Sequence, residues 1–83
     1  MDQKAFIAFA KAVVAECTGD GVTTNDVYVV WYCKTLQNQK ALLGTPVRDG
    51  KYFEVTYNGD KQQVYLDEYI KSKNVCFDVN NVK

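Results

Sequence analysis

The sequence predicts an α+β domain, with an N-terminal helix packed on a mainly antiparallel β-sheet whose strands form a meander, followed by a short C-terminal helix and a final strand. Three observations favour this class: apolar residues at helical spacing near the N-terminus, β-branched and aromatic runs further along, and turn dipeptides between those runs. A chain of 83 residues has room for one hydrophobic core, so we expect a single domain over residues 1–83.

The segment from Asp2 to about Cys17 predicts the helix, because its apolar residues recur at spacings of three and four and therefore share one face. Gly19 and Gly21 follow where this period stops, and glycine readily adopts the positive φ that commonly closes a helix. The apolar face is expected to comprise Phe6, Phe9, Ala10, Val13, Val14 and Cys17.

The run from Asp26 to Lys34 predicts the first strand, since β-branched and aromatic residues dominate it. Both of its faces are largely apolar, which is typical of a strand that is covered on both sides. A polar reversal over residues 35–39 then leads into a second strand over residues 40–45. Strict alternation in the first strand places Val27, Val29, Trp31 and Cys33 on one face, and Tyr28, Val30, Tyr32 and Lys34 on the other.

Asn58-Gly59 lies between two β-rich runs within residues 51–66. It predicts a hairpin with a two-residue type I′ turn, in which both central residues have positive φ. This turn sets Phe53 opposite Val64 and so fixes the two faces of the hairpin. The core face then carries Phe53, Val55, Val64 and Leu66, and the other face carries Tyr52, Glu54, Thr56, Lys61, Gln63 and Tyr65.

The remaining residues predict the short C-terminal helix and the final strand. Asp67 is a suitable N-cap for a helix that runs to about Lys73. From Val75 to Val79 apolar side chains alternate with other residues, as they do in a strand with one covered face. We expect this strand to complete the sheet.

Composition argues against an enzyme, a metal site and a cofactor. The chain has no histidine, which is the commonest acid–base residue and metal ligand, and its three cysteines, Cys17, Cys33 and Cys76, are widely spaced. We expect these thiols to be reduced and mostly buried. No phosphate-binding glycine loop and no nucleophile elbow occurs in the sequence.

Charge and hydropathy restrict the partners. Ten basic and ten acidic side chains cancel, so the long-range field that attracts nucleic acid or anionic membranes is missing. No apolar run approaches the roughly 18 residues of a membrane span, and residues 1–4 lack the basic start of a secretion signal. We therefore expect an intracellular protein without membrane association.

A candidate binding region spans Trp31 to Lys40, where an aromatic strand leads into a turn rich in amide and ammonium donors. Lys34 and Lys40 would supply positive charge to an anionic or planar ligand, and Trp31 a stacking surface. Gln37 and Asn38 would add directed hydrogen bonds. The plainer interpretation is that Trp31 fills the core and that the polar residues form an ordinary hairpin loop.

The tyrosines are a second candidate. Tyr52 and Tyr65 share the sheet face opposite the core, and Tyr28 or Tyr32 can join them. Tyrosine suits interfaces because its ring offers apolar contact area while its hydroxyl tolerates residual water. Since one helix covers only one of two sheet faces, we expect this face to serve self-association or a partner. The alternative is that half-exposed rings pack only on each other.

The runs VYVVWYCKTLQNQKALL (residues 27–43) and YFEVTYNGDKQQVYLDEYIK (residues 52–71) resemble those of a small uncharacterised protein family encoded by bacteriophages and prophages of Gram-positive bacteria. The likeness covers nearly the whole chain. It implies an accessory protein in the cytoplasm of an infected host bacterium. Small phage proteins there often bind and disable a host component, for example in host takeover or counter-defence.

These observations predict a non-enzymatic binding protein, expected to form a homo-oligomer, that occludes a host bacterial protein or sequesters a small anionic ligand. A nucleic-acid-binding accessory factor is the alternative, and a hydrolase that uses carboxylates alone is a third hypothesis. Nucleic acid would be contacted by basic residues at neighbouring turns, namely Lys34, Lys40, Arg48, Lys51 and Lys61, and the hydrolase would use Glu54, Asp67 and Glu68.

Overall fold

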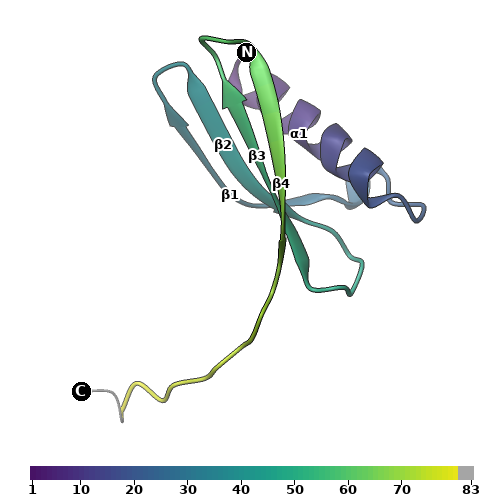
Figure 1. The fold of residues 1–83 in the computed structure, drawn as a ribbon, viewed down its shortest axis with the longest axis vertical. Helices are drawn as coiled ribbons and strands as arrows, with labels where there is room; N and C mark the ends of the chain where they lie inside the picture. The colour runs from purple at the N-terminus through teal and green to yellow at the C-terminus, as the bar shows by residue number, and fades with distance from the viewer. Residues whose placement is uncertain (81–83) are drawn as a thin grey trace.

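The computed structural model describes residues 1–80 and contains one α-helix, a short 3₁₀ helix and a four-stranded antiparallel sheet (Figure 1). The strands pair in the chain order β1-β2-β3-β4, so the sheet is a meander. The predicted α+β class, the N-terminal helix and the antiparallel meander are confirmed. The elements are α1 (Gln3–Thr18), η1 (Thr24–Asp26), β1 (Tyr28–Thr35), β2 (Asn38–Gly44), β3 (Lys51–Asn58) and β4 (Gln63–Ile70).

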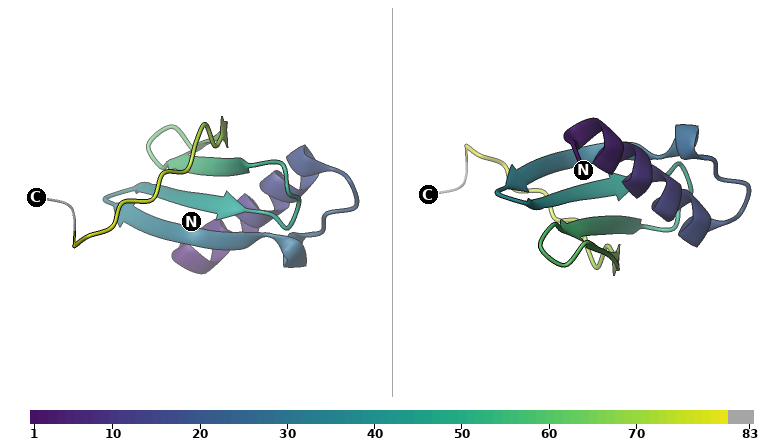
Figure 2. Two further views of the ribbon diagram at one scale, coloured as in Figure 1. Left: turned by 90° about the horizontal axis from the view of Figure 1, so that it is seen from below. Right: turned by 90° about the horizontal axis from the view of Figure 1, so that it is seen from above.

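Helix α1 begins and ends at local caps. The Asp2 carboxylate accepts a hydrogen bond from the Ala5 N–H at 2.7 Å, which satisfies one of the free donors of the first turn. Gly19 adopts the predicted positive φ, 66°, and its N–H donates to the Ala15 carbonyl oxygen at 3.1 Å. The helix lies across one face of the sheet, where it contacts β2 and β3 (Figure 2).

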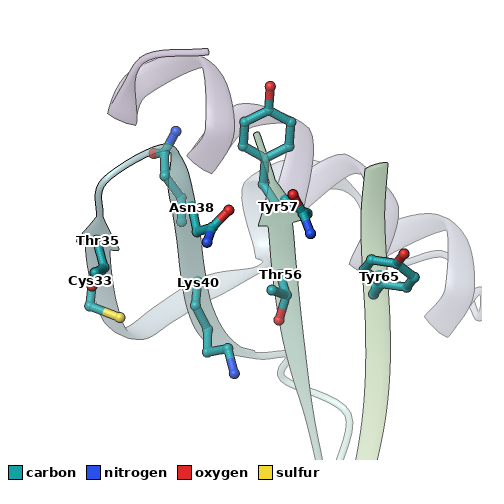
Figure 3. A pocket seen from close by; sticks show the side chains of 9 residues that line it. Cys33, Thr35, Asn38, Lys40, Thr56, Tyr57 and Tyr65 are labelled. Carbon is teal, nitrogen blue, oxygen red and sulfur yellow. The ribbon is translucent and has the colours of Figure 1, made fainter. Parts of the chain in front are cut away.

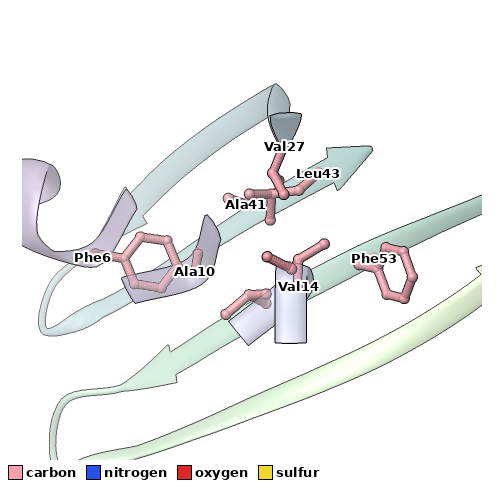
Figure 4. Close-up of a cluster of buried hydrophobic side chains, with 9 residues drawn as sticks. Phe6, Ala10, Val14, Val27, Ala41, Leu43 and Phe53 are labelled. Atoms are coloured by element: carbon pink, nitrogen blue, oxygen red, sulfur yellow. The ribbon is translucent and has the colours of Figure 1, made fainter. Parts of the chain in front are cut away.

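The core lies between α1 and the sheet (Figure 4). The helix contributes a narrow stripe at intervals of four, from Phe6 through Ala10 to Val14. Phe9 and Cys17, predicted on the apolar face, are exposed because a single helix meets a sheet along one such stripe. The buried apolar side chains are Phe6, Ala10, Val14, Ala15, Val27, Ala41, Leu43, Phe53 and Val55.

A β-bulge interrupts β1. Val29 pairs with Leu43 and Trp31 pairs with Leu42, which leaves Val30 as an extra residue between them. Side chains alternate between the two faces of a strand, so one extra residue reverses the assignment of every side chain beyond it. The strict alternation predicted for this strand therefore fails after Val30.

Because of the bulge, the side chains of β1 beyond Val30 lie on the faces opposite to those predicted. Tyr32 faces α1, where its ring centroid lies 5.9 Å from that of Phe6 and its hydroxyl donates to the Gln39 side-chain oxygen at 2.6 Å. Trp31 and Cys33, predicted to share a face with the preceding valines, point to the side of the sheet away from the helix.

Strands β3 and β4 form the predicted hairpin with a different turn. Asn58 pairs with Gln63, so residues 59–62 form a four-residue loop in place of the predicted two-residue turn. The Asn58 side-chain oxygen accepts hydrogen bonds from the N–H groups of Asp60, at 3.1 Å, and Lys61, at 3.2 Å. The asparagine thus stabilises a wider turn than the dipeptide alone predicts.

The wider turn leaves the predicted faces of the hairpin intact. Phe53 lies opposite Glu68, whereas the prediction set it opposite Val64. The two registers differ by four residues, and an even shift keeps every side chain on its face. The core face therefore carries the expected apolar residues.

Gly59 allows a close approach between two turns. Its N–H donates to the Asn38 side-chain oxygen at 3.2 Å, and a Cβ at this position would overlap the carbonyl oxygen of Gln37. Gly59 is absent from the residues with positive φ, which include Gln62 at 51°. The glycine is therefore needed for space and not for the φ of a type I′ turn.

The prediction of a short C-terminal helix from Asp67 to Lys73 is wrong, because the residues from Asp67 to Ile70 belong to strand β4. Pairing with β3 outweighs the weak helical preference of a short segment, and it extends to the Lys71 N–H, which donates to the Gly50 carbonyl oxygen at 2.8 Å. Within residues 1–80 the last regular element is a strand, as predicted, and it is β4. Residues 75–79, expected to form that strand, lie without strand pairing beyond it (Figure 1).

We predict that Gly59→Ala lowers the free energy of unfolding by about 1–3 kcal/mol, because its Cβ would overlap a backbone oxygen that cannot move aside. Urea unfolding followed by circular dichroism measures the change. Asp60→Ala, at an exposed position in the same loop, is the control and should change stability by no more than about 0.5 kcal/mol. Equal stabilities of the two variants would contradict the contact between the turns.

Candidate functional site

The outer face is the side of the sheet opposite α1. No helix or strand within residues 1–80 covers it, so its side chains meet solvent (Figure 2). Trp31 is 39% exposed, Tyr28 is 48% exposed and Tyr65 is 49% exposed. The large side chains of the outer face are Tyr28, Trp31, Leu42, Tyr52, Tyr65 and Tyr69.

Cross-strand pairing arranges the outer face in rows. Each row takes one side chain from each strand, and such neighbours interact directly. Two neighbouring rows run across the centre of the sheet. The first contains Trp31, Leu42, Glu54 and Asp67, and the second contains Cys33, Lys40, Thr56 and Tyr65. In these two rows the aromatic rings are Trp31 of β1 and Tyr65 of β4, and the β2 and β3 residues between them are polar except for Leu42. Glu68, the third carboxylate of the hydrolase hypothesis, lies on the opposite face of β4.

A hollow of about 430 Å³ lies on the outer face, near the end where the β1–β2 and β3–β4 turns meet (Figure 3). The Lys40 ammonium lies beside it, but its Nζ atom is 3.4 Å from the Glu54 carboxylate, so the local charge is largely balanced. Hydroxyl and amide groups make the hollow suitable for a polar group with hydrogen-bonding capacity. Its outer-face lining includes Cys33, Thr35, Asn38, Lys40, Thr56 and Tyr65.

The structure divides the five residues of the predicted binding region between two faces. Asn38 and Lys40 line the hollow, and Trp31 lies in the adjacent row of the outer face. Lys34 pairs with the buried Gln39 and so lies on the helix side, and Gln37 lines a separate depression there together with it. The predicted region is therefore two groups of residues and not one site.

The structure places three of the four predicted interface tyrosines on the outer face, namely Tyr28, Tyr52 and Tyr65. Tyr32 is the exception and the prediction for it is wrong, because the bulge turns its side chain toward α1. The Tyr28 ring lies over Gly44, where an added Cβ would be 2.5 Å from the ring. Glycine at this position lets the ring lie against the sheet.

Sequence reasoning missed two residues of the outer face. Tyr69 was predicted within a helix, although the alternation from Tyr65 through Asp67 to Tyr69 is the signal that could have placed it on a strand. Leu42 pairs with Trp31, and the prediction of a strand over residues 40–45 assigns it to neither face. Both extend the aromatic and apolar area of the outer face.

The basic residues of the nucleic-acid alternative do not form one patch. Lys34 and Lys61 lie toward the end of the sheet that carries the β1–β2 and β3–β4 turns, whereas Arg48 and Lys51 lie at the opposite end. Lys40 lies between them, paired with a carboxylate. A meander places alternate turns at opposite ends, so turns that are neighbours in sequence are not neighbours in space.

The three cysteines, Cys17, Cys33 and Cys76, are free, as expected, but all are exposed. The expectation that they are mostly buried is wrong, because two lie on open faces and the third lies beyond the sheet. Within residues 1–80 no group of three or more cysteine and carboxylate side chains could hold a metal ion. No helix in this part of the chain has the length and apolar character needed to cross a membrane.

The model of a family of unknown function, DUF6275, matches residues 3–79. The chain belongs to this family. No curated protein and no solved structure matches the chain. The DUF6275 match extends from the first turn of α1 to Val79, so it includes both the outer face and the apolar residues that follow β4.

We predict that Trp31→Ala lowers the free energy of unfolding by only about 1 kcal/mol, because the ring is already partly exposed. Phe6→Ala, which empties a fully buried position, should cost about 3–5 kcal/mol. Chemical denaturation measures both values. In the native protein, acrylamide should quench the Trp31 fluorescence readily, and protection of the ring would contradict its placement on the outer face.

Proposed function

We propose that this chain is a non-enzymatic binding protein that occludes a partner protein with its outer face. The observation that carries the proposal is the exposure of Trp31, Tyr28 and Tyr65 on a face that no helix or strand of residues 1–80 covers. Tryptophan and tyrosine contribute much of the binding energy of protein interfaces, because they bury a large area while few rotamers are lost.

Charge favours a protein partner over a small anionic ligand. The ammonium of Lys40 is already 3.4 Å from the Glu54 carboxylate, so an anion in the hollow would compete with that carboxylate. Lys34, the second cation of the predicted region, lies on the other side of the sheet. A hollow lined by hydroxyl and amide groups beside open aromatic rings suits a polar side chain or main-chain group of a protein.

The resemblance to phage and prophage proteins supports a host bacterial protein as the partner and the bacterial cytoplasm as the location. In this proposal the protein acts in host takeover or counter-defence by covering a surface that the partner needs. Occlusion requires no catalytic group and no cofactor. The fraction of partner molecules that are blocked depends on the ratio of the two proteins, since each bound copy blocks one partner surface.

We predict that a double variant, Trp31→Ala with Tyr28→Ala, captures much less of the partner from a host lysate than the parent does. Loss of one interface aromatic costs about 2 kcal/mol, so two should weaken the complex by about a thousandfold. Pull-down with mass spectrometry identifies the partner, and calorimetric titration of that purified partner measures the change in Kd.

The matched control is Lys34→Ala with Gln37→Ala, which removes two polar residues from the helix side of the sheet and should bind as the parent does. An unchanged Kd for the aromatic double variant would contradict the proposal. Capture of DNA or RNA, with an affinity that falls steeply as salt is added, would favour the nucleic-acid alternative.

A further inference from the structure

Residues 71–80 continue β4 beyond the end of the sheet. The last main-chain hydrogen bond of the hairpin runs from the Lys71 N–H to the Gly50 carbonyl oxygen. Beyond it the chain extends away from the body of the domain (Figure 1). Because β3 begins at Lys51, the neighbouring strand has no residues left to pair with this segment.

The segment has the side-chain pattern of a strand. Tyr65 and Tyr69, at odd positions of β4, lie on the outer face, and Val75, Phe77 and Val79 continue the same parity. Val75 is 56% exposed and Phe77 is 74% exposed. A solvated linker needs no alternating apolar residues, whereas a strand with one covered face does. The segment therefore has the composition of a strand without a partner strand in residues 1–80.

The free edge of β4 is suited to receive a strand. β4 is last in the sheet and pairs with β3 over eight consecutive residues without a bulge, so its other edge presents a regular row of N–H and C=O groups. β1, at the opposite edge, is interrupted by the bulge at Val30. Ile70, at the end of β4, is 66% exposed.

We propose that two copies of this chain associate across a two-fold axis, with β4 of each copy paired antiparallel to residues 71–77 of the other. The register that best matches the side chains sets Ile70 opposite itself on the axis. On the outer face it sets Val75 opposite Tyr65 and Lys73 opposite Asp67. Directly opposite residues share a face, so Val75 meets the Tyr65 ring and the unlike charges of Lys73 and Asp67 meet each other.

Length and symmetry agree with this pairing. Residues 63–70 and residues 70–77 have equal lengths of about 26 Å at roughly 3.3 Å per residue. Each copy supplies both halves of the interface, so every contact is made twice and the assembly closes at two copies. The two four-stranded sheets would join into one continuous sheet. The inference rests on the edge of β4 and not on the proposed function.

Sedimentation velocity of the full chain over a concentration series tests the proposal. We expect a dimer that dissociates on dilution, and a monomer at the highest concentrations would overturn the proposal. Val75→Asp should weaken association by about a hundredfold, because it places a carboxylate against Tyr65 of the second copy. Val75 lies outside the sheet, so the thermal unfolding of the monomer should not change. Undiminished association of this variant would also overturn the proposal.

A charge exchange tests the register. Lys73→Glu should weaken the dimer by about tenfold, since like charges then face each other at two symmetric places. Adding Asp67→Lys should restore the affinity, and Lys4→Glu, the same charge change on an exposed part of α1, should have no effect. Failure of the double variant to recover would contradict the register.

The outcome can be distinguished from that of the proposed function. Val75→Asp leaves Tyr28 and Trp31 of β1 unchanged, so the resulting monomer still carries the two aromatic residues whose removal tests the proposed function. If this monomer captures the partner, the proposed function stands whether or not the wild-type chain dimerises. If the dimer forms and the partner is not captured, only the inference about association stands.

Discussion

The extra residue at Val30 determines which side chains of β1 beyond it lie on each side of the sheet. Without it, Trp31 would lie on the same face as Val29, which points toward the core, and its ring would compete with α1 for space there. With it, Tyr32 turns inward and its hydroxyl donates to Gln39, whose side-chain nitrogen donates to the carbonyl oxygen of Met1 at 2.7 Å. Gln39 is 2% exposed and is satisfied at both ends, so the bulge also links the sheet to the start of the helix. Trp31 lies on the outer face because of this one residue.

Much of the fold could be predicted from the sequence, because some sequence patterns give the correct face of a strand even when the predicted register is wrong. The hairpin faces were correct although the turn was not, since the true register differs from the predicted one by an even number of residues. The bulge was not predictable in this way, because Val30 has the same strand preference as its neighbours and nothing marks it as the extra residue. The prediction of a C-terminal helix was wrong for a different reason. Asp67 is a suitable helix cap when only its neighbours in sequence are considered, but pairing with β3 decides its conformation.

The candidate site was predictable in kind more than in detail. That one helix leaves a second face open follows from the number of elements, and three of the four proposed tyrosines lie on that face. The region from Trp31 to Lys40 divides because a strand and its turn present successive side chains to opposite sides. Asn38 and Lys40 therefore join Trp31 on the outer face, while Lys34 lies on the other. Which polar residues meet in space depends on the bulge and on the turn.

The meander topology also bears on the order in which the molecule can fold during synthesis. Every strand pairs with the strand next to it in sequence, so each ladder closes a short loop and can form as soon as its second strand leaves the ribosome. Helix α1 is made first, yet its contacts with the sheet include those to β2 and β3, which follow later. Its apolar stripe is fully buried only after those strands have paired. Docking of the helix, and not strand pairing, is then the long-range step that completes the native core.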